Sequence, residues 1–183
     1  MAITRLGPNN STNITGINLT SAVTGTLPAA NGGTGATSFA PGKVLQVQST
    51  LNGNDFSTTS TSFTDVTGMS LTITPSATSS KILLLCNTNT YNNTDEAYFG
   101  MRWERAISGG ATTAFGNSTY GQSFARSAQA HDFWGGVGMT YLDSPSTTSE
   151  ITYQVQAKAS SGTINISVNS TNQNNIIALE IAG

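Results

Sequence analysis

Short apolar runs with a period of two dominate the chain from Phe39 onward. Met69, Leu71 and Ile73 alternate with polar residues, so a strand would place all three on one face. Residues 82–86 are apolar throughout, which is typical of a strand buried on both faces. Similar runs lie at residues 44–47, 63–66, 97–107, 133–142, 151–157, 164–168 and 176–181. These eight to ten strands, with no helical pattern, predict an all-β fold, an antiparallel β-sandwich of the jelly-roll type.

The run at residues 97–107 alternates large side chains. Phe99, Met101 and Trp103 fall on one face, and Arg102 and Glu104 fall on the other. We expect the first three in the core. The Arg102–Glu104 pair could bridge neighbouring strands or subunits, or it could be an ordinary surface ion pair of low energy.

The chain carries little charge. Charged residues make up 9% of its 183 residues, against about 25% in ordinary soluble domains, and the formal net charge is −2. Seven Lys and Arg residues form no cluster, so we expect no nucleic-acid partner. Residues 1–5 lack the apolar core of a signal peptide, and no run approaches the ~18 apolar residues of a membrane span. We therefore expect synthesis in the cytosol and no membrane span.

Composition divides the chain into three parts. Residues 1–24 hold too few apolar side chains for a core and would be disordered alone or become ordered on a partner. Residues 25–40 are rich in Gly and contain Pro28, which restricts the preceding residue to extended conformations. That composition also fits a simple flexible linker. Residues 41–183 form the predicted β domain.

The stretch Gly25-Thr-Leu-Pro-Ala-Ala-Asn-Gly-Gly-Thr-Gly35 resembles the segment that joins the two functional parts of bacteriophage tail-fibre proteins. The matching positions are Leu27, Pro28, Gly32, Gly33, Thr34 and Gly35. The opening Met-Ala-Ile-Thr-Arg-Leu-Gly is similar to the start of short phage virion proteins. The resemblance implies a protein of the phage tail, made in the host cytoplasm, whose N-terminal segment binds a tail adaptor or another virion component. The implied attachment residues are Ile3, Arg5, Leu6, Ile14, Ile17 and Leu19. A tag-like tail is the alternative.

The β domain resembles the trimeric jelly-roll heads similar to complement C1q and tumour-necrosis-factor domains. The matching features are Val66-x-Gly68-x-x-Leu71, the run Lys81-Ile-Leu-Leu and the final Ala178-Leu-Glu-Ile181. This resemblance implies a homotrimer. The periodicity alone also fits a monomeric sandwich.

Residues with catalytic or metal-binding chemistry are sparse. His131 is the only histidine, and no Gly-x-Ser-x-Gly motif accompanies it, so a hydrogen-bonded surface or interface role is favoured over catalysis. Asp95 and Glu96 are adjacent, and neighbours on a strand point in opposite directions, which is unsuitable for a glycosidase carboxylate pair. A calcium site at Asp95 is a weak alternative. Cys86 is alone in an apolar run and should be a buried hydrophobe. We expect no enzyme, no cofactor and no metal.

Binding by surface loops is the remaining function. The candidate loops are residues 87–96 and 109–129, and aromatic side chains in such loops stack on sugars or anchor protein contacts. These aromatics could equally pack beneath their own loops. The candidate receptor-binding residues, for a host surface glycan or protein, are Tyr91, Asp95, Phe115, Tyr120 and Phe124. The hypothesis is a short trimeric tail fibre that recognises the host cell, with a capsid or tail decoration protein and a carbohydrate-active enzyme as alternatives.

Overall fold

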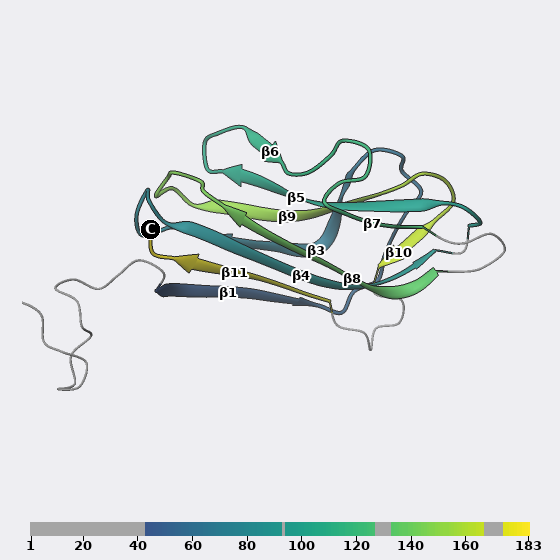
Figure 1. Cartoon of the computed structure of the whole chain (residues 1–183), viewed down its shortest axis with the longest axis horizontal. Helices are drawn as coiled ribbons and strands as arrows, with labels where there is room; N and C mark the ends of the chain where they lie inside the picture. The colour runs from purple at the N-terminus through teal and green to yellow at the C-terminus, as the bar shows by residue number, and fades with distance from the viewer. Residues whose placement is uncertain (1–42, 93, 127–132, 167–173) are drawn as a thin grey trace, which may run out of the picture. The chain divides into compact units, whose positions relative to one another are not determined.

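The computed structural model describes residues 43–92, 94–126, 133–166 and 174–183 (Figure 1). The chain divides into two units, residues 1–40 and 41–183, and the described residues belong to the second. The predictions for the attachment segment, for the linker with Pro28, Gly32, Gly33 and Gly35, and for His131 lie outside these residues. The described strands are β1 (Val44–Asn52), β2 (Phe56–Thr58), β3 (Thr64–Ile73), β4 (Lys81–Asn92), β5 (Tyr98–Ile107), β6 (Thr112–Ala114), β7 (Ser123–Arg126), β8 (Phe133–Asp143), β9 (Ile151–Ala159), β10 (Ile164–Ile166) and β11 (Asn174–Ile181).

The strands form two antiparallel sheets packed face to face (Figure 1). One sheet has six strands in the order β1-β11-β4-β10-β2, with β8 paired to the free side of β4. The other has five strands in the order β3-β9-β5-β6, with β7 also paired to β5. Consecutive strands often fall in different sheets, as expected of a jelly-roll-like sandwich. The predicted fold class, an all-β antiparallel β-sandwich, is confirmed.

The core lies between the two sheets and follows the predicted faces. Met69, Leu71 and Ile73 of β3 are all buried, and so are Phe99, Met101 and Trp103 of β5. They pack against Tyr153 of β9 and against alternate residues of β4 and β8. A strand with one apolar face is held in register by that face, because a slip of one residue would expose every core side chain.

One strand differs from its prediction. Residues 82–86 are buried on one face only: Ile82, Leu84 and Cys86 point into the core, whereas Leu83 and Leu85 lie on the outer face and are partly exposed. The run is apolar at every position because the outer face is itself apolar here. Cys86 is buried as predicted, and burial raises the pKa of its thiol to about 12.

The predicted loop at residues 87–96 is also wrong in extent, because β4 continues to Asn92. The inward-pointing hydroxyls of Thr88 and Thr90 donate to the backbone carbonyls of Val137 and Gly135 on β8, at 3.1 and 3.0 Å. These bonds let polar residues continue a buried strand. The predicted loop 109–129 likewise contains the short strands β6 and β7.

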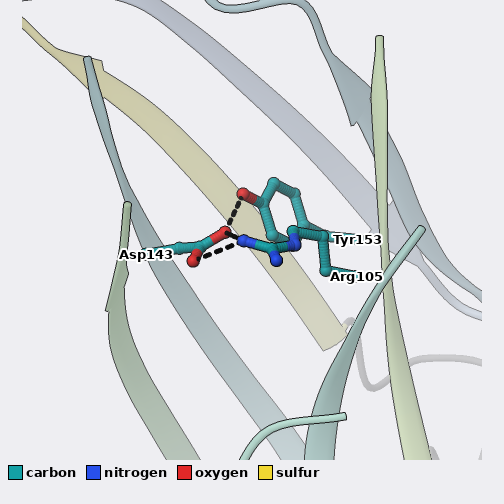
Figure 2. Close-up of polar contacts among 3 residues, drawn as sticks. All are labelled: Arg105, Asp143 and Tyr153. Carbon is teal, nitrogen blue, oxygen red and sulfur yellow. Dashed lines mark hydrogen bonds and ion pairs between the residues drawn. The ribbon is translucent and has the colours of Figure 1, made fainter. Parts of the chain in front are cut away.

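A buried ion pair joins the two sheets (Figure 2). Arg105 of β5 donates from Nη1 to both carboxylate oxygens of Asp143 on β8, at 2.9 and 3.0 Å. The Tyr153 hydroxyl of β9 donates to Asp143 Oδ2 at 2.6 Å. Burial, and then the hydrogen bond to Asp143, raise the pKa of the Tyr153 hydroxyl, so it remains a donor. Arg102 instead donates from Nε to Gln156 Oε1 at 2.8 Å, and within the described residues of one chain it forms no ion pair with Glu104.

A second buried carboxylate, Glu180 of β11, lies where the edges of β1 and β3 meet. Ser76 donates its backbone N–H and its hydroxyl to Glu180 Oε1, and Gln46 donates to Oε2 at 2.6 Å. Burial alone would raise the pKa of Glu180. The hydrogen bonds from Ser76 and Gln46 outweigh burial and lower the pKa to about 2.

Candidate ligand-binding site

A pocket of about 520 Å³ opens on the outer side of the five-stranded sheet. Strands β5 and β7 supply its floor: Tyr98 is paired with Arg126, and Gly100 with Phe124, on the face of β5 opposite to the buried Phe99. The residues that line it are Glu96, Tyr98, Tyr120, Phe124, Arg126 and Ser160. Its volume lies within the range of about 300–1,000 Å³ that is typical of small-molecule sites.

Three aromatic rings form one wall of the pocket. The ring centroids of Tyr98 and Tyr120 are 5.0 Å apart, and those of Tyr120 and Phe124 are 5.2 Å apart. Tyr120 is 44% exposed and Phe124 is 58% exposed. Tilted contacts at these spacings are favourable between aromatic rings, so the three support one another while their outer surfaces remain available.

A tight turn fixes the position of Tyr120. Asn117 and Gly121 exchange backbone hydrogen bonds at 3.0 and 2.8 Å, and Asn117 Oδ1 accepts the backbone N–H groups of Thr119 and Tyr120. The turn lies directly on β5, where a Cβ atom on Gly100 would come within 2.6 Å of the Tyr120 carbonyl oxygen. Gly100 is therefore required for this close approach.

An ion pair borders the aromatic wall. Arg126 Nη2 lies 3.6 Å from Glu96 Oε2, and Arg126 Nε donates to the Glu96 carbonyl at 3.1 Å. Glu96 has a φ of 55°, a left-handed conformation that is unusual for a residue other than glycine and recurs at functional sites. Ser160 Oγ accepts the Tyr98 backbone N–H at 2.9 Å, which leaves the hydroxyl hydrogen to donate. The rim thus offers both donors and acceptors to a ligand.

The sequence-predicted residues separate into three places. Tyr120 and Phe124 meet in the pocket, and Asp95 is exposed next to Glu96 without lining it. Tyr91 lies on β4 of the other sheet, where its ring centroid is 4.2 Å from that of Trp134.

The prediction for Phe115 is wrong. Phe115 is 8% exposed and its ring stacks on that of Tyr141 with centroids 4.4 Å apart, so it packs beneath its own loop. That burial removes Phe115 from any surface contact with a receptor.

Four pocket residues were not among the predicted binding residues, although the first and third lie within the predicted loops: Glu96, Tyr98, Arg126 and Ser160. The period of two did place Tyr98 on the face opposite to the core, which was the available signal. The pairing of β5 with β7, and the contact of Ser160 with Tyr98, depend on long-range strand registration that local patterns do not reveal. The described residues contain no group of three or more His, Cys, Asp or Glu that could hold a metal ion. No helix capable of crossing a membrane is present in that part of the chain.

A second surface lies on the outer face of the six-stranded sheet. The strand register aligns Val47 of β1, Leu179 of β11, Leu83 of β4 and Leu142 of β8 in one row. Val47 is 55% exposed and Leu142 is 48% exposed. Ile177 and Leu85 form the next row. We call these six residues the outer apolar patch; contiguous exposed apolar surface of this kind is typical of interaction sites.

The outer face of the five-stranded sheet is polar around Arg102 and Glu104. The register places Arg102 beside Gln156, and Gln154 between Glu104 and Ser70. A monomeric sandwich with both outer faces in water would carry polar residues on both, because alternation normally places polar side chains outward. The outer apolar patch departs from that rule on the six-stranded sheet.

No family model matches the chain, and no curated protein matches it. Among solved structures, that of infectious bursal disease virus Gx strain is 13% identical, aligns with 76% of this chain and 33% of that chain, and has a TM-score of 0.42. The structure of the Gt strain of the same virus is 11% identical, aligns with 80% of this chain and 40% of that chain, and has a TM-score of 0.36. The structure of a VP2 subviral particle of this virus is 9% identical, aligns with 75% of this chain and 40% of that chain, and has a TM-score of 0.35. The chain thus spans at most two fifths of these neighbours. At TM-scores below 0.5 the similarity assigns no function, and the fold stands on the strand pairings above.

Proposed function

We propose that the protein is a structural component of a bacteriophage particle, a short trimeric tail fibre that contacts the host cell. Residues 1–24 attach it to a tail adaptor or another virion component, residues 25–40 are the linker, and the β domain is the receptor-binding head. The protein binds and does not catalyse. The observation that carries the proposal is the outer apolar patch, combined with the resemblance of residues 25–35 to phage fibre linkers.

The outer apolar patch fits an interface with further copies of the same chain. It crosses four adjacent strands, β1, β11, β4 and β8, and so covers a broad part of one sheet. Burial of apolar area stabilises association by about 25 cal/mol per Å², and Leu142 and Val47 offer the most exposed area. Identical patches brought together around one rotation axis satisfy one another in a closed assembly.

The pocket supports binding and gives no support to hydrolysis. Glu96 is the single carboxylate among the residues that line it, and Arg126 is paired with that carboxylate. Hydrolysis of a glycosidic bond generally needs two carboxyl groups about 5–10 Å apart on either side of the bond. The described pocket residues lack the second group.

Mass measurement in solution tests the assembly. We expect the full chain to be a trimer at micromolar concentration, and Val47→Glu/Leu142→Glu to be monomeric with an unchanged β circular dichroism spectrum, since three sets of charges would meet in a desolvated interface. Thr72→Glu, an exposed position on the outer face of the other sheet, is the matched control and should remain trimeric. A monomeric wild-type chain would refute the trimeric fibre.

Cell binding tests the second half of the proposal. Fluorescently labelled wild-type chain should bind to the surface of at least one strain in a panel of bacteria, and the monomeric variant should bind more weakly because it loses multivalency. A trimer that binds to no strain, but binds to purified phage particles, would favour the decoration protein instead.

A further inference from the structure

We infer that the pocket on the five-stranded sheet binds a neutral pyranose unit of a surface glycan. The inference deepens the proposed function, on which it rests for the source of the ligand. Its chemistry rests on two features of the described residues: the aromatic wall of Tyr98, Tyr120 and Phe124, and the balanced charge of Arg126 and Glu96.

The aromatic wall matches one side of a sugar ring. A pyranose has a face of C–H groups and a rim of hydroxyls, so it needs an apolar platform with polar groups at its border. Phe124 has no polar atom on its ring, is 58% exposed, and lies beside the tilted ring of Tyr120. Removing this apolar surface from water favours a ligand with an apolar face over a fully polar one.

The rim selects against charge. The Arg126 guanidinium and the Glu96 carboxylate are 3.6 Å apart, so the positive charge that would attract an anionic ligand is already compensated. A cationic ligand would in turn meet Arg126. Neighbouring hydroxyls of a sugar both donate and accept, and a rim that presents guanidinium N–H groups, carboxylate oxygens and the Ser160 hydroxyl can satisfy both roles.

The site is formed before the ligand arrives. The Asn117–Gly121 turn holds Tyr120 against Gly100, and the left-handed backbone at Glu96 directs its carbonyl to Arg126. Side chains that are already held lose less conformational freedom on binding, so a small ligand such as one sugar unit can bind measurably.

A second aromatic pair provides the competing location. Tyr91 and Trp134 lie on the six-stranded sheet with ring centroids 4.2 Å apart, and Trp134 is 59% exposed, almost the same fraction as Phe124. The register pairs Tyr91 with Trp134 of β8 on one side and with Asn165 of β10 on the other, so this aromatic pair lies on a different sheet from the pocket. Trp134→Ala is therefore a matched control for non-specific binding of a sugar to an exposed aromatic ring.

The test uses the full chain and ligand-observed saturation-transfer NMR. The probes are the methyl pyranosides of glucose, galactose, mannose and N-acetylglucosamine, with the methyl glycoside of N-acetylneuraminic acid as the anionic probe and choline as the cationic probe. We expect at least one neutral pyranoside to bind saturably with a millimolar Kd, and the two charged probes to bind at least tenfold more weakly.

Three variants locate the site and test its charge balance. Phe124→Ala should weaken binding of the neutral pyranoside by about tenfold or more, whereas Trp134→Ala should leave it unchanged. Glu96→Gln leaves the Arg126 charge uncompensated, so it should weaken the neutral pyranoside and strengthen the anionic glycoside. Each variant is first checked for unchanged circular dichroism and unchanged mass in solution.

Three outcomes would overturn the inference: no neutral pyranoside binds, the anionic glycoside binds best to the wild type, or Trp134→Ala abolishes binding while Phe124→Ala does not. The proposed function fails separately. A trimer that binds to cells but to none of the pyranosides refutes the ligand class alone, and a chain that binds a pyranoside at the pocket without assembling or binding to cells refutes the fibre alone.

Discussion

Replacement of Asp143 by Asn is the most direct test of the packing between the two sheets. Asp143 is buried and accepts three hydrogen bonds, two from Arg105 Nη1 and one from the Tyr153 hydroxyl. Asn keeps the shape of the side chain and removes its charge. The Arg105 guanidinium then remains between the sheets without a counterion.

The expected cost follows from the burial of the two partners. Removing one member of a buried ion pair typically costs 3–5 kcal/mol, because the remaining charge is desolvated and unpaired. The Arg105 side chain is 17% exposed and keeps some contact with water, whereas the Asp143 side chain is 6% exposed. We therefore expect a loss at the lower end, about 3 kcal/mol in the free energy of unfolding. For a domain of this size that corresponds to a fall in Tm of roughly 10 °C.

Two further variants separate charge from hydrogen bonding. Tyr153→Phe removes one hydrogen bond to a charged acceptor and should cost about 1.5 kcal/mol, with the ion pair intact. The double variant Arg105→Met/Asp143→Leu removes both charges and should recover most of the stability lost in Asp143→Asn. Thermal melting is followed by circular dichroism at one fixed protein concentration, because assembly makes Tm depend on concentration.

An Asp143→Asn variant that is no less stable than Tyr153→Phe, or a double variant that is less stable than Asp143→Asn, would contradict this role of the ion pair. Either result would mean that Arg105 reaches water once its partner is lost. The ion pair would then contribute to the choice of strand register more than to stability.

Two other substitutions have effects on stability whose direction follows from the structure. The pKa of Glu180 is lowered from 4.5 to about 2, so ionised Glu180 stabilises the fold by up to about 3 kcal/mol above pH 4.5, and this stabilisation is lost as the pH falls towards 2. In urea titrations, the difference in unfolding free energy between the wild type and Glu180→Gln should therefore shrink over that pH interval. A difference that stays constant would contradict the assignment. Gly121→Ala should lower the free energy of unfolding by about 2 kcal/mol or more, because Gly121 has a φ of 76° and the added Cβ would collide with the Met101 carbonyl. Gly109→Ala has a similar φ of 77° but nothing within 4 Å of the added Cβ, so it should lower the free energy of unfolding by only about 1 kcal/mol. Equal melting temperatures for the two variants would show that the collision is relieved.

The sequence predicted the fold through its core-facing residues. Met69, Leu71 and Ile73, like Phe99, Met101 and Trp103, obey a period of two that has a single physical cause, burial on one face. Residues 82–86 were misread because local pattern cannot distinguish a residue buried in its own domain from one on an exposed apolar face. The two residues that were wrongly predicted to be buried, Leu83 and Leu85, belong to the outer apolar patch.

The candidate site was predictable only in part, because its members come from separate segments. Tyr120 and Phe124 were found as aromatics in a polar segment, and Phe115 was chosen by the same criterion although it stacks inside on Tyr141. Whether a loop aromatic is exposed or buried depends on which strand the loop crosses, and the local sequence does not reveal that strand. Arg126 and Glu96 meet because β7 is paired with β5, a contact fixed by the fold as a whole.

The two proposed surfaces lie on opposite faces of one sandwich, and this arrangement links assembly to recognition. The outer apolar patch belongs to the six-stranded sheet, and the pocket opens on the outer side of the five-stranded sheet. Copies that associate through the patch therefore leave each pocket uncovered. A single pyranose site is expected to be weak, but three sites on one rigid body can bind a repeating surface glycan together, and such linkage raises overall affinity by about 10²–10⁴ without any new contact. The monomeric Val47→Glu/Leu142→Glu variant should consequently bind methyl pyranosides as the wild type does, yet lose cell binding. Equal loss of both activities would show that the pocket depends on the assembly.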